Sequence, residues 1–309
     1  MIEPDSGRGS CLSALETGGM HDVRGRFLRS REQRRLTMNA HQETMKHAYL
    51  PHVTTADAVA WGGLVLALLG GVTVVLAGLG SRWGWWHFTV GFTILQVGAI
   101  TGIAAAVVSL VGGIAIRREH HPSLIVVAAA GIVIGLVTAG IPWSWIRTAE
   151  EMPNINDITT DMTNPPQFVK LMALRQSVDA PTSYGGARVA NQQRASYPNI
   201  RPIILPVDPS TAFSAALKDA RESGWQIVNA DASKGIIEAV ATTFWFGFKD
   251  DVVVRIKPVP GGSRVDMRSA SRVGIGDIGA NAKRIRSYLE SLAKTSIIDN
   301  NYTSFAKGY

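Results

Sequence analysis

Three long stretches of the chain carry no charged side chain, and they constrain the fold more than any other feature. They span residues 58–80, 88–116 and 123–146. An α-helix rises about 1.5 Å per residue, so about 20 apolar residues cross the hydrocarbon core of a bilayer. A buried soluble core rarely contains three such stretches in succession. The sequence therefore predicts three transmembrane helices within residues 57–147.

The Lys and Arg residues around these stretches indicate their orientation. Residues 23–46 contain seven basic and two acidic side chains, and the second link carries Arg117 and Arg118, whereas the first link carries only Arg82. Basic segments near spans stay in the cytoplasm. We therefore expect a multi-pass protein of the cytoplasmic (inner) membrane, with a cytoplasmic N-terminus and everything after residue 147 outside the cytoplasm. In this topology five tryptophans fall at the outer interface: Trp83, Trp85, Trp86, Trp143 and Trp145.

Small residues recur at four-residue steps in the predicted spans. Such faces let helix backbones approach closely, although chance in Gly- and Ala-rich helices explains them equally well. Gln96 is the only amide in the spans, and no ionisable group lies in mid-membrane. We therefore expect an anchor in the lipid bilayer rather than a transporter. The candidate packing residues are Gly63, Ala67 and Gly71; Gly98, Gly102 and Ala106; and Gly131, Gly135 and Ala139.

The polar N-terminal region and the distribution of reactive side chains exclude several classes of function. Residues 1–50 have no apolar run, so we expect a disordered tail without a signal peptide, with Met38 or Met45 as an alternative start. The single cysteine is Cys11, and all seven histidines lie at or before His121. We therefore expect no thiol chemistry, Ser-His-Asp triad, zinc site or cofactor in the exported part. Its charges nearly balance, which disfavours nucleic acid as a partner.

The remainder of the chain is predicted to form a linker and one domain. Residues 148–200 are rich in Pro, Asn, Asp, Thr and Gln, so we expect a linker that packs on the domain, with a short helix around Pro166–Arg175. Alternating apolar residues and turn signals over 201–296 predict the order β-α-β-β-β-β-α, followed by a C-terminal tail at 297–309. Short turns make the strands antiparallel, and two amphipathic helices cover one face of the sheet. We therefore expect a membrane-anchored, two-layer α+β domain.

The most polar stretch, VDMRSASRVGIGDIGANAKRIR, covers residues 265–286. Gly274, Gly276 and Gly279 give it the spacing G-x-G-x-x-G of dinucleotide-binding loops. Such a loop needs a parallel strand after its helix, and here the last helix runs almost to the C-terminus. We therefore expect a sharp turn from strand to helix, with Asp277 capping the helix.

The polar side chains around this turn form the candidate site. Alternation along a strand places Arg268 and Arg272 on one face and Ser269 on the other. Three interpretations remain open: a structural Arg–Asp–Asn network, a site for an anion or polar ligand, and acid/base catalysis by Asp250 and Asp251. Adjacent strand residues point to opposite faces, so the last interpretation requires a bulge. The candidate residues are Asp250, Asp251, Arg255, Asp266, Arg268, Ser269, Ser271, Arg272, Asp277, Asn281 and Arg284.

Five stretches in the second half of the chain resemble a known bacterial family, the domain of unknown function 1499. The resemblance covers residues 150–295 and implies no activity. Members of the family show Pro-Pro-Ile-His where this chain has Pro153 to Asn156, so any role of that histidine is absent. The stretches are NINDITTDMTNPPQF (154–168), YPNIRPIILPVDPSTAF (197–213), GWQIVNAD (224–231), FGFKDDVVVRI (246–256) and VDMRSASRVGIGDIGANAKRIR (265–286).

The sequence therefore predicts a membrane-anchored envelope module without catalytic residues. We expect it to bind an envelope protein, a polar ligand or cell-wall material, or to have a structural role. The alternative is a hydrolase or transferase acting on an anionic envelope substrate. In that case Asp250 or Asp251 acts as acid or base, and Arg268 and Arg272 stabilise the substrate's charge.

Overall fold

The computed structural model describes residues 32–39, 54–119 and 122–306. Residue contacts divide the chain into two units, Met1–Thr55 and Ala56–Tyr309. Within the first unit a helix covers residues 32–39. The expectations of a disordered tail and of a start at Met45 otherwise lie outside the described residues.

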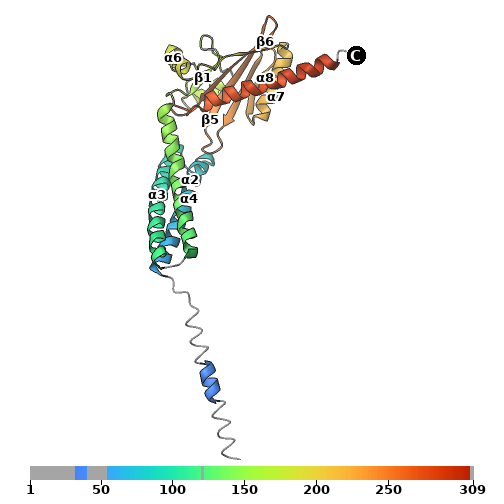
Figure 1. Ribbon diagram of the computed structural model, residues 1–309. Coiled ribbons are helices and arrows are strands. Elements are labelled where there is room, and N and C mark those ends of the chain that lie inside the picture. Colours follow the sequence, from blue (N-terminus) through green and yellow to red (C-terminus); the bar gives the residue numbers. More distant parts are fainter. Residues whose placement is uncertain (1–31, 40–53, 120–121, 307–309) are drawn as a thin grey trace, which may run out of the picture. The chain divides into compact units, whose positions relative to one another are not determined.

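Three helices of the second unit are long and apolar enough to cross a membrane. They are α2 (Thr55–Arg82), α3 (Phe88–Glu119) and α4 (Pro122–Glu151), and they lie side by side in Figure 1. Each contains one of the three uncharged stretches of the sequence. Three apolar helices, as expected from those stretches, are thus present.

Glycines bring the backbones of α3 and α4 into direct contact. A Cβ atom added to Gly135 would lie 2.5 Å from the carbonyl oxygen of Gly102 and 2.9 Å from the backbone nitrogen of Ala106. Gly98 instead faces α2, where an added Cβ would lie 2.7 Å from a methyl group of Val74. Close backbone approach is the usual basis of helix association in lipid, where no hydrophobic drive operates.

The predicted packing face in α4 needs one correction. Ala139 is only half-buried, whereas its neighbour Thr138 is buried and faces Gly102. Gly131 lies against Ser109 of α3, as expected for a packing residue. An α-helix has 3.6 residues per turn, so a strict four-residue step drifts around the helix and by its third position has left the contact.

The domain that follows α4 contains a six-stranded antiparallel sheet in the order β1-β6-β5-β4-β3. A sixth strand, β2, also pairs with β6. β1 pairs with Arg268–Ala270 and β2 with Ser263–Val265, so two short strands share one edge of β6. The strands are β1 (Asp157–Thr159), β2 (Ile203–Leu205), β3 (Gln226–Asp231), β4 (Ile236–Thr242), β5 (Lys249–Val259) and β6 (Gly262–Ser271).

A buried glutamine pairs with the backbone N–H and C=O groups at the outer edge of β1. The side-chain oxygen of Gln193 accepts a hydrogen bond from the Thr159 backbone nitrogen (3.0 Å), and its side-chain nitrogen donates to the Thr159 carbonyl (2.6 Å). Gln193 belongs to α6 (Gly186–Ser196). The amide thereby replaces the backbone of a further strand, so β1 does not present an open edge here.

Helices α7 (Pro209–Glu222) and α8 (Ala280–Ala306) lie across one face of the sheet (Figure 1). Asp208 starts α7 by accepting hydrogen bonds from the backbone nitrogens of Ser210 and Thr211, with Pro209 in the first turn. Hydrogen bonds from Ser210 and Thr211 hold the pKa of Asp208 below its usual range. The main core lies between these helices and the sheet, and its largest buried members include Ile158, Ile237, Met267, Ile285, Tyr288 and Leu292.

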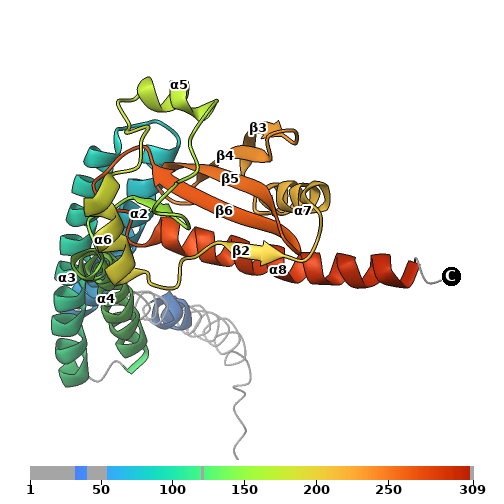
Figure 2. The same ribbon diagram turned by 90° about the horizontal axis from the view of Figure 1, so that it is seen from above.

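The region expected to be a linker contributes to the domain more than the sequence indicates. It supplies strand β1, and residues 160–185, here called the covering segment, lie on the second face of the sheet. In this segment Phe168 and Leu171 pack on Val240 and Val253. In Figure 2, β5 and β6 lie between α5 (Leu171–Gln176) and α8. The expected two-layer arrangement is thus extended by a third, irregular layer.

Two expected boundaries also differ. The short helix expected around Pro166–Arg175 begins at Leu171, and α6 was not expected. The last helix continues to Ala306, where a tail from residue 297 was expected. β1 has only three residues, so it carries no alternation that a sequence pattern can reveal.

The contact between α3 and α4 leads to a first prediction. Gly135→Leu should lower the unfolding free energy of the full chain in detergent micelles by about 1–3 kcal/mol, because the new side chain must push apart two touching backbones. Thermal unfolding followed by circular dichroism measures the change. Gly140→Leu is the matched control in the same helix, since nothing lies within 4 Å of a Cβ atom there. Equal melting of the two variants would contradict the packing described above.

Candidate functional site

The predicted polar cluster is divided between the two faces of the sheet. Asp250 and Ser269 face α8, whereas Asp251 and Arg268 face the covering segment. β5 and β6 pair in register from Asp250 opposite Ser271 to Val259 opposite Gly262, without a bulge. Asp250 and Asp251 therefore do not share one site. The sequence pattern predicted this alternation, but not the two separate networks that result.

The first network joins β5 and β6 to the first turns of α8. Arg284 donates to Asp250 (2.5 Å) and to Ser269 (2.9 Å). Ser269 donates to the side-chain oxygen of Asn281 (2.6 Å), and the Asn281 amide donates to Ser271 (2.9 Å). Because each of these polar groups has a partner, the network fixes α8 on the sheet without an unpaired buried charge.

The turn that leads into α8 has the form expected from its glycines. Gly274 and Gly279 have positive φ angles of 86° and 76°, where glycine is least strained. The Asp277 carboxylate accepts from the backbone nitrogens of Gly279 (3.0 Å) and Asn281 (2.6 Å), as a capping residue does. Burial raises the pKa of Asp277 above its ordinary value, and these hydrogen bonds oppose the rise. α8 begins at Ala280, three residues later than Asp277.

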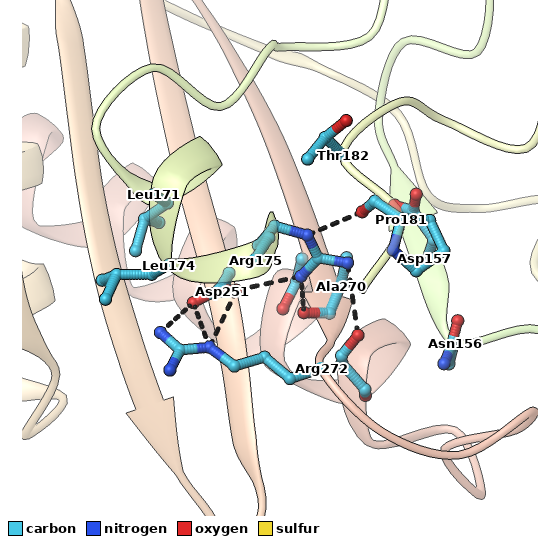
Figure 3. Close-up of polar contacts among 12 residues, drawn as sticks. Asn156, Asp157, Leu171, Leu174, Arg175, Pro181, Thr182, Asp251, Ala270 and Arg272 are labelled. Atoms are coloured by element: carbon cyan, nitrogen blue, oxygen red, sulfur yellow. Dashed lines mark hydrogen bonds and ion pairs between the residues drawn. The ribbon is translucent and has the colours of Figure 1, made fainter. Parts of the chain in front are cut away.

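The second network centres on Asp251, which is fully buried. Figure 3 shows two arginines that converge on its carboxylate from different elements. Arg272 binds both oxygens (2.7–3.1 Å), and Arg175 of α5 binds one oxygen at 2.9 Å. Arg175 also donates to the carbonyl oxygens of Pro181 (2.7 Å) and Ala270 (3.0 Å). Burial lowers the pKa of Arg175, while its ion pair with Asp251 opposes the change.

Arg268 lies deepest in the second network, with none of its side chain exposed. Its guanidinium binds both oxygens of Asp157 in β1, at 2.9 and 2.8 Å. The same guanidinium lies 4.5 Å from the ring centroid of Phe168, and that of Arg175 lies 4.8 Å from it. Two paired arginines thus contact one aromatic ring of the covering segment, which combines ion pairing with cation–π attraction.

A third group of charges lies further along β5 and β6. Arg255 and Asp266 are directly opposite in the register, and their side chains pair at 2.9 Å. Arg264 binds Asp266 (2.9 Å) and also reaches Asp161 (3.0 Å) in the covering segment. Arg255 adds a hydrogen bond to the carbonyl oxygen of Asn164 (2.9 Å). The covering segment is therefore held to the sheet by ion pairs along most of β6.

Glu238 of β4 holds the start of α5. It is fully buried, and its two oxygens accept from the backbone nitrogens of Val169 (2.7 Å), Lys170 (2.8 Å) and Leu171 (3.2 Å). Asn229 donates to it as well, at 3.0 Å. A carboxylate that accepts several backbone hydrogen bonds is well accommodated in the interior.

Sequence reasoning missed several of the residues that complete these networks. Asp157 and Asp161 were visible in the stretch NINDITTDMTNPPQF, but only as part of the family resemblance. Nothing local connected them with arginines about 100 residues away. The missed partners are Asp157, Asp161, Phe168, Arg175, Glu238 and Arg264.

The arrangement determines what the cluster can do chemically. Each predicted arginine, namely Arg255, Arg268, Arg272 and Arg284, forms an ion pair with a carboxylate. A guanidinium that is already paired with a buried carboxylate has little remaining attraction for a further anion. Among the described residues, no group of three or more His, Cys, Asp and Glu side chains is placed to hold a metal ion. These ion pairs hold α8 and the covering segment to the sheet.

A different part of the domain contacts the ends of α2 and α3. The β4–β5 loop, residues 243–248, reads TFWFGF. Trp245 donates to the carbonyl oxygen of Val75 (2.9 Å), and its indole ring lies directly against Gly78. Arg82 donates to the carbonyl oxygens of Thr243 and Phe244, at 2.8 Å each. Gly78 leaves room for the indole ring, so the loop and the end of α2 interlock.

Aromatic rings extend this contact. Phe246 and Phe248 stack with their centroids 5.4 Å apart, and both lie near Phe92 of α3. Trp145 of α4 meets Trp245 edge to face at 4.8 Å. The sequence pattern extends the strand to Phe246 and indicates a turn only at residues 247–249, whereas β4 ends at Thr242 and frees these aromatic residues for the contact.

Comparison with known proteins gives a family match for part of the chain. Residues 157–292 match the model of a family described as "Protein of unknown function (DUF1499)". The resemblance based on five sequence stretches is thereby confirmed for the DUF1499 region. No curated protein matches the chain. Among solved structures, the crystal structure of Ara h 8.0201 is 11% identical and covers 31% of this chain and 95% of its own, with a TM-score of 0.20. A likeness at that score carries no argument.

The Arg268–Asp157 pair leads to a prediction about the DUF1499 region. Arg268→Ala should lower the unfolding free energy of the full chain by about 3–5 kcal/mol, because it leaves Asp157 without its partner in a buried position. Chemical denaturation in detergent micelles measures the change. Lys234→Ala is the control and should melt like the wild type, since the pair of Lys234 with Asp231 is exposed.

A double variant separates the ion pair from simple loss of packing. Arg268→Met combined with Asp157→Leu removes both charges and keeps most of the volume, so it should recover part of the stability lost in Arg268→Ala. If Arg268→Ala melts like the wild type, Arg268 does not hold the covering segment.

Proposed function

We propose that the protein is a membrane-anchored module of the bacterial envelope whose DUF1499 domain lies outside the cytoplasm and acts by binding rather than by catalysis. One observation carries this proposal: the four arginines of the candidate site, together with Asp250, Asp251 and Asp266, are engaged in ion pairs that hold the domain together. A catalytic or anion-binding role requires groups that remain available to a substrate.

The proposed location rests on the charge pattern and the three apolar helices. The basic residues lie before α2 and in the last turn of α3. Five tryptophans lie at the opposite ends of these helices, where indoles favour a membrane–water interface. Trp83, Trp85 and Trp143 are largely exposed, which suits contact with lipid headgroups.

The rival function, a hydrolase or transferase, has less support. Asp250 and Asp251 point to opposite faces, and each is buried and paired with arginine. A general acid or base must reach the substrate, either directly or through one water molecule. Arg268, which the rival function uses to stabilise an anion, has no exposed surface.

The proposed topology predicts the behaviour of reporter fusions. Alkaline phosphatase fused after Tyr309 should be active, because this enzyme matures only outside the cytoplasm. The same enzyme fused after Arg117, in the last turn of α3, should be inactive and serves as the matched control. Green fluorescent protein should give the reverse pattern. Fluorescence after Tyr309 with no phosphatase activity would place the domain in the cytoplasm and end the envelope proposal.

Turnover measurements discriminate between binding and catalysis. The full chain in lipid nanodiscs should hydrolyse phosphoester, ester and amide substrates no faster than the double variant Asp250→Asn and Asp251→Asn. The asparagine amides retain hydrogen-bond acceptors for the arginines, and thermal melting checks that the variant folds. Activity in the wild type that disappears in a folded double variant would favour the rival function.

A further inference from the structure

Two loops of the domain expose large apolar side chains beside one another. Phe244 of the β4–β5 loop is 84% exposed, and Ile275 and Ile278 of the β6–α8 loop are 82% and 45% exposed. Single exposed apolar residues are common on protein surfaces, but a group of them marks an interaction site. Both loops border the same clefts, and Phe244 and Ile278 line the larger one together.

The larger of these clefts has a volume of about 460 Å³. Its walls come from the β4–β5 loop, the start of α8 and the last turns of α4. Trp145, Trp245 and Ile278 contribute much of its apolar lining, and a smaller cleft of about 190 Å³ adjoins it beside Phe248. Volumes of this size hold small ligands or parts of larger ones.

The cleft opens where the apolar surface of α4 ends. Trp145 and Thr148 of α4 line it, and the α4 residues Ile141 and Trp143, which precede them, are exposed. If α4 spans a bilayer, lipid covers those residues and reaches the edge of the cleft without a break. The β4–β5 loop forms another wall of the cleft. The hydrogen bond from Trp245 to the carbonyl oxygen of Val75 holds this loop against α2.

The polar groups at the cleft fit a phosphate headgroup. Lys283 lies on its rim and is exposed. No carboxylate in the described part of the chain lies within salt-bridge distance of it. Asp277 also borders the cleft, but its carboxylate accepts hydrogen bonds from its own turn. The cleft therefore combines an apolar lining with one exposed cation at its rim. A phospholipid has the matching features, which are an apolar acyl chain and an anionic phosphate.

We propose that this cleft binds one phospholipid of the adjoining leaflet, with an acyl chain in the cleft and the phosphate at Lys283. The proposal rests on the membrane anchor proposed above. A peptide or a second copy of the protein fits less well, because acyl chains of the adjoining leaflet already reach the edge of the cleft. Extended peptides also need backbone partners, whereas aromatic and aliphatic side chains form most of the lining.

Photo-crosslinking tests the proposal on the full chain. p-Benzoylphenylalanine replaces Phe244, and the protein is purified from cells into detergent micelles without added lipid. Only tightly held lipid then remains. Irradiation should give adducts whose mass equals protein plus one phospholipid. The control position is Ile204, which is 66% exposed but lies on β2, beside the opposite end of β6. It should give about tenfold fewer adducts, as expected where no site holds the lipid.

A second pair of variants locates the lipid in the cleft. Ala280→Trp places an indole in the cleft, and displacing about two methylenes of the acyl chain should lower adduct formation at Phe244 about tenfold. Ala293→Trp, further along α8 and outside this cleft, should leave the adducts unchanged. Melting curves check that both variants fold.

Three results would overturn the proposal. One is an equal yield of lipid adducts at Phe244 and Ile204. Another is a crosslink from Phe244 to a protein, whether a second copy or a different chain. The third is unchanged adduct formation in a folded Ala280→Trp variant. None of these results affects the reporter fusions, so failure of the lipid site is distinguishable from failure of the membrane topology.

Discussion

A guanidinium with no exposed surface has to be neutralised where it lies, and Arg268 is placed in that way. Its partner Asp157 is in β1, which is otherwise held by three residues of pairing with β6 and by the Gln193 amide at its outer edge. Forming the ion pair therefore also places the strand by which the chain enters the sheet. The covering segment follows directly from β1, and Phe168 then packs against the same guanidinium. Much of the second face of the sheet thus depends on one charge.

Features that depend on local patterns could be predicted from the sequence. The uncharged stretches indicate the three apolar helices, and the period of two along residues 265–273 indicates which side chains share a face of β6. The start of α7 follows from Asp208 and Pro209, whose roles need only their immediate neighbours. In each case the information lies in one continuous stretch of the chain and requires no distant partner.

Features that depend on distant partners could not be predicted. Asp251 looked like half of a possible acid/base pair until Arg175, 76 residues away, was seen to neutralise it. Residues 148–200 looked like a linker because their composition is polar. That polarity instead serves ion pairs with arginines of the sheet, as Asp157 and Asp161 show. A single sequence contains no signal that joins such partners.

The separation of these partners along the chain also sets the order in which the domain can fold. Asp157 and Arg268 are 111 residues apart, so β1 cannot be held until β6 has been synthesised. Contacts of such long range are formed late, after the entropy of closing a large loop has been overcome. Until then, one edge of β6 lacks the strand β1, and the Gln193 amide has no paired strand to cover. During that interval an unpaired strand edge is open to pairing with other chains, which is the stage at which this domain is most exposed to aggregation.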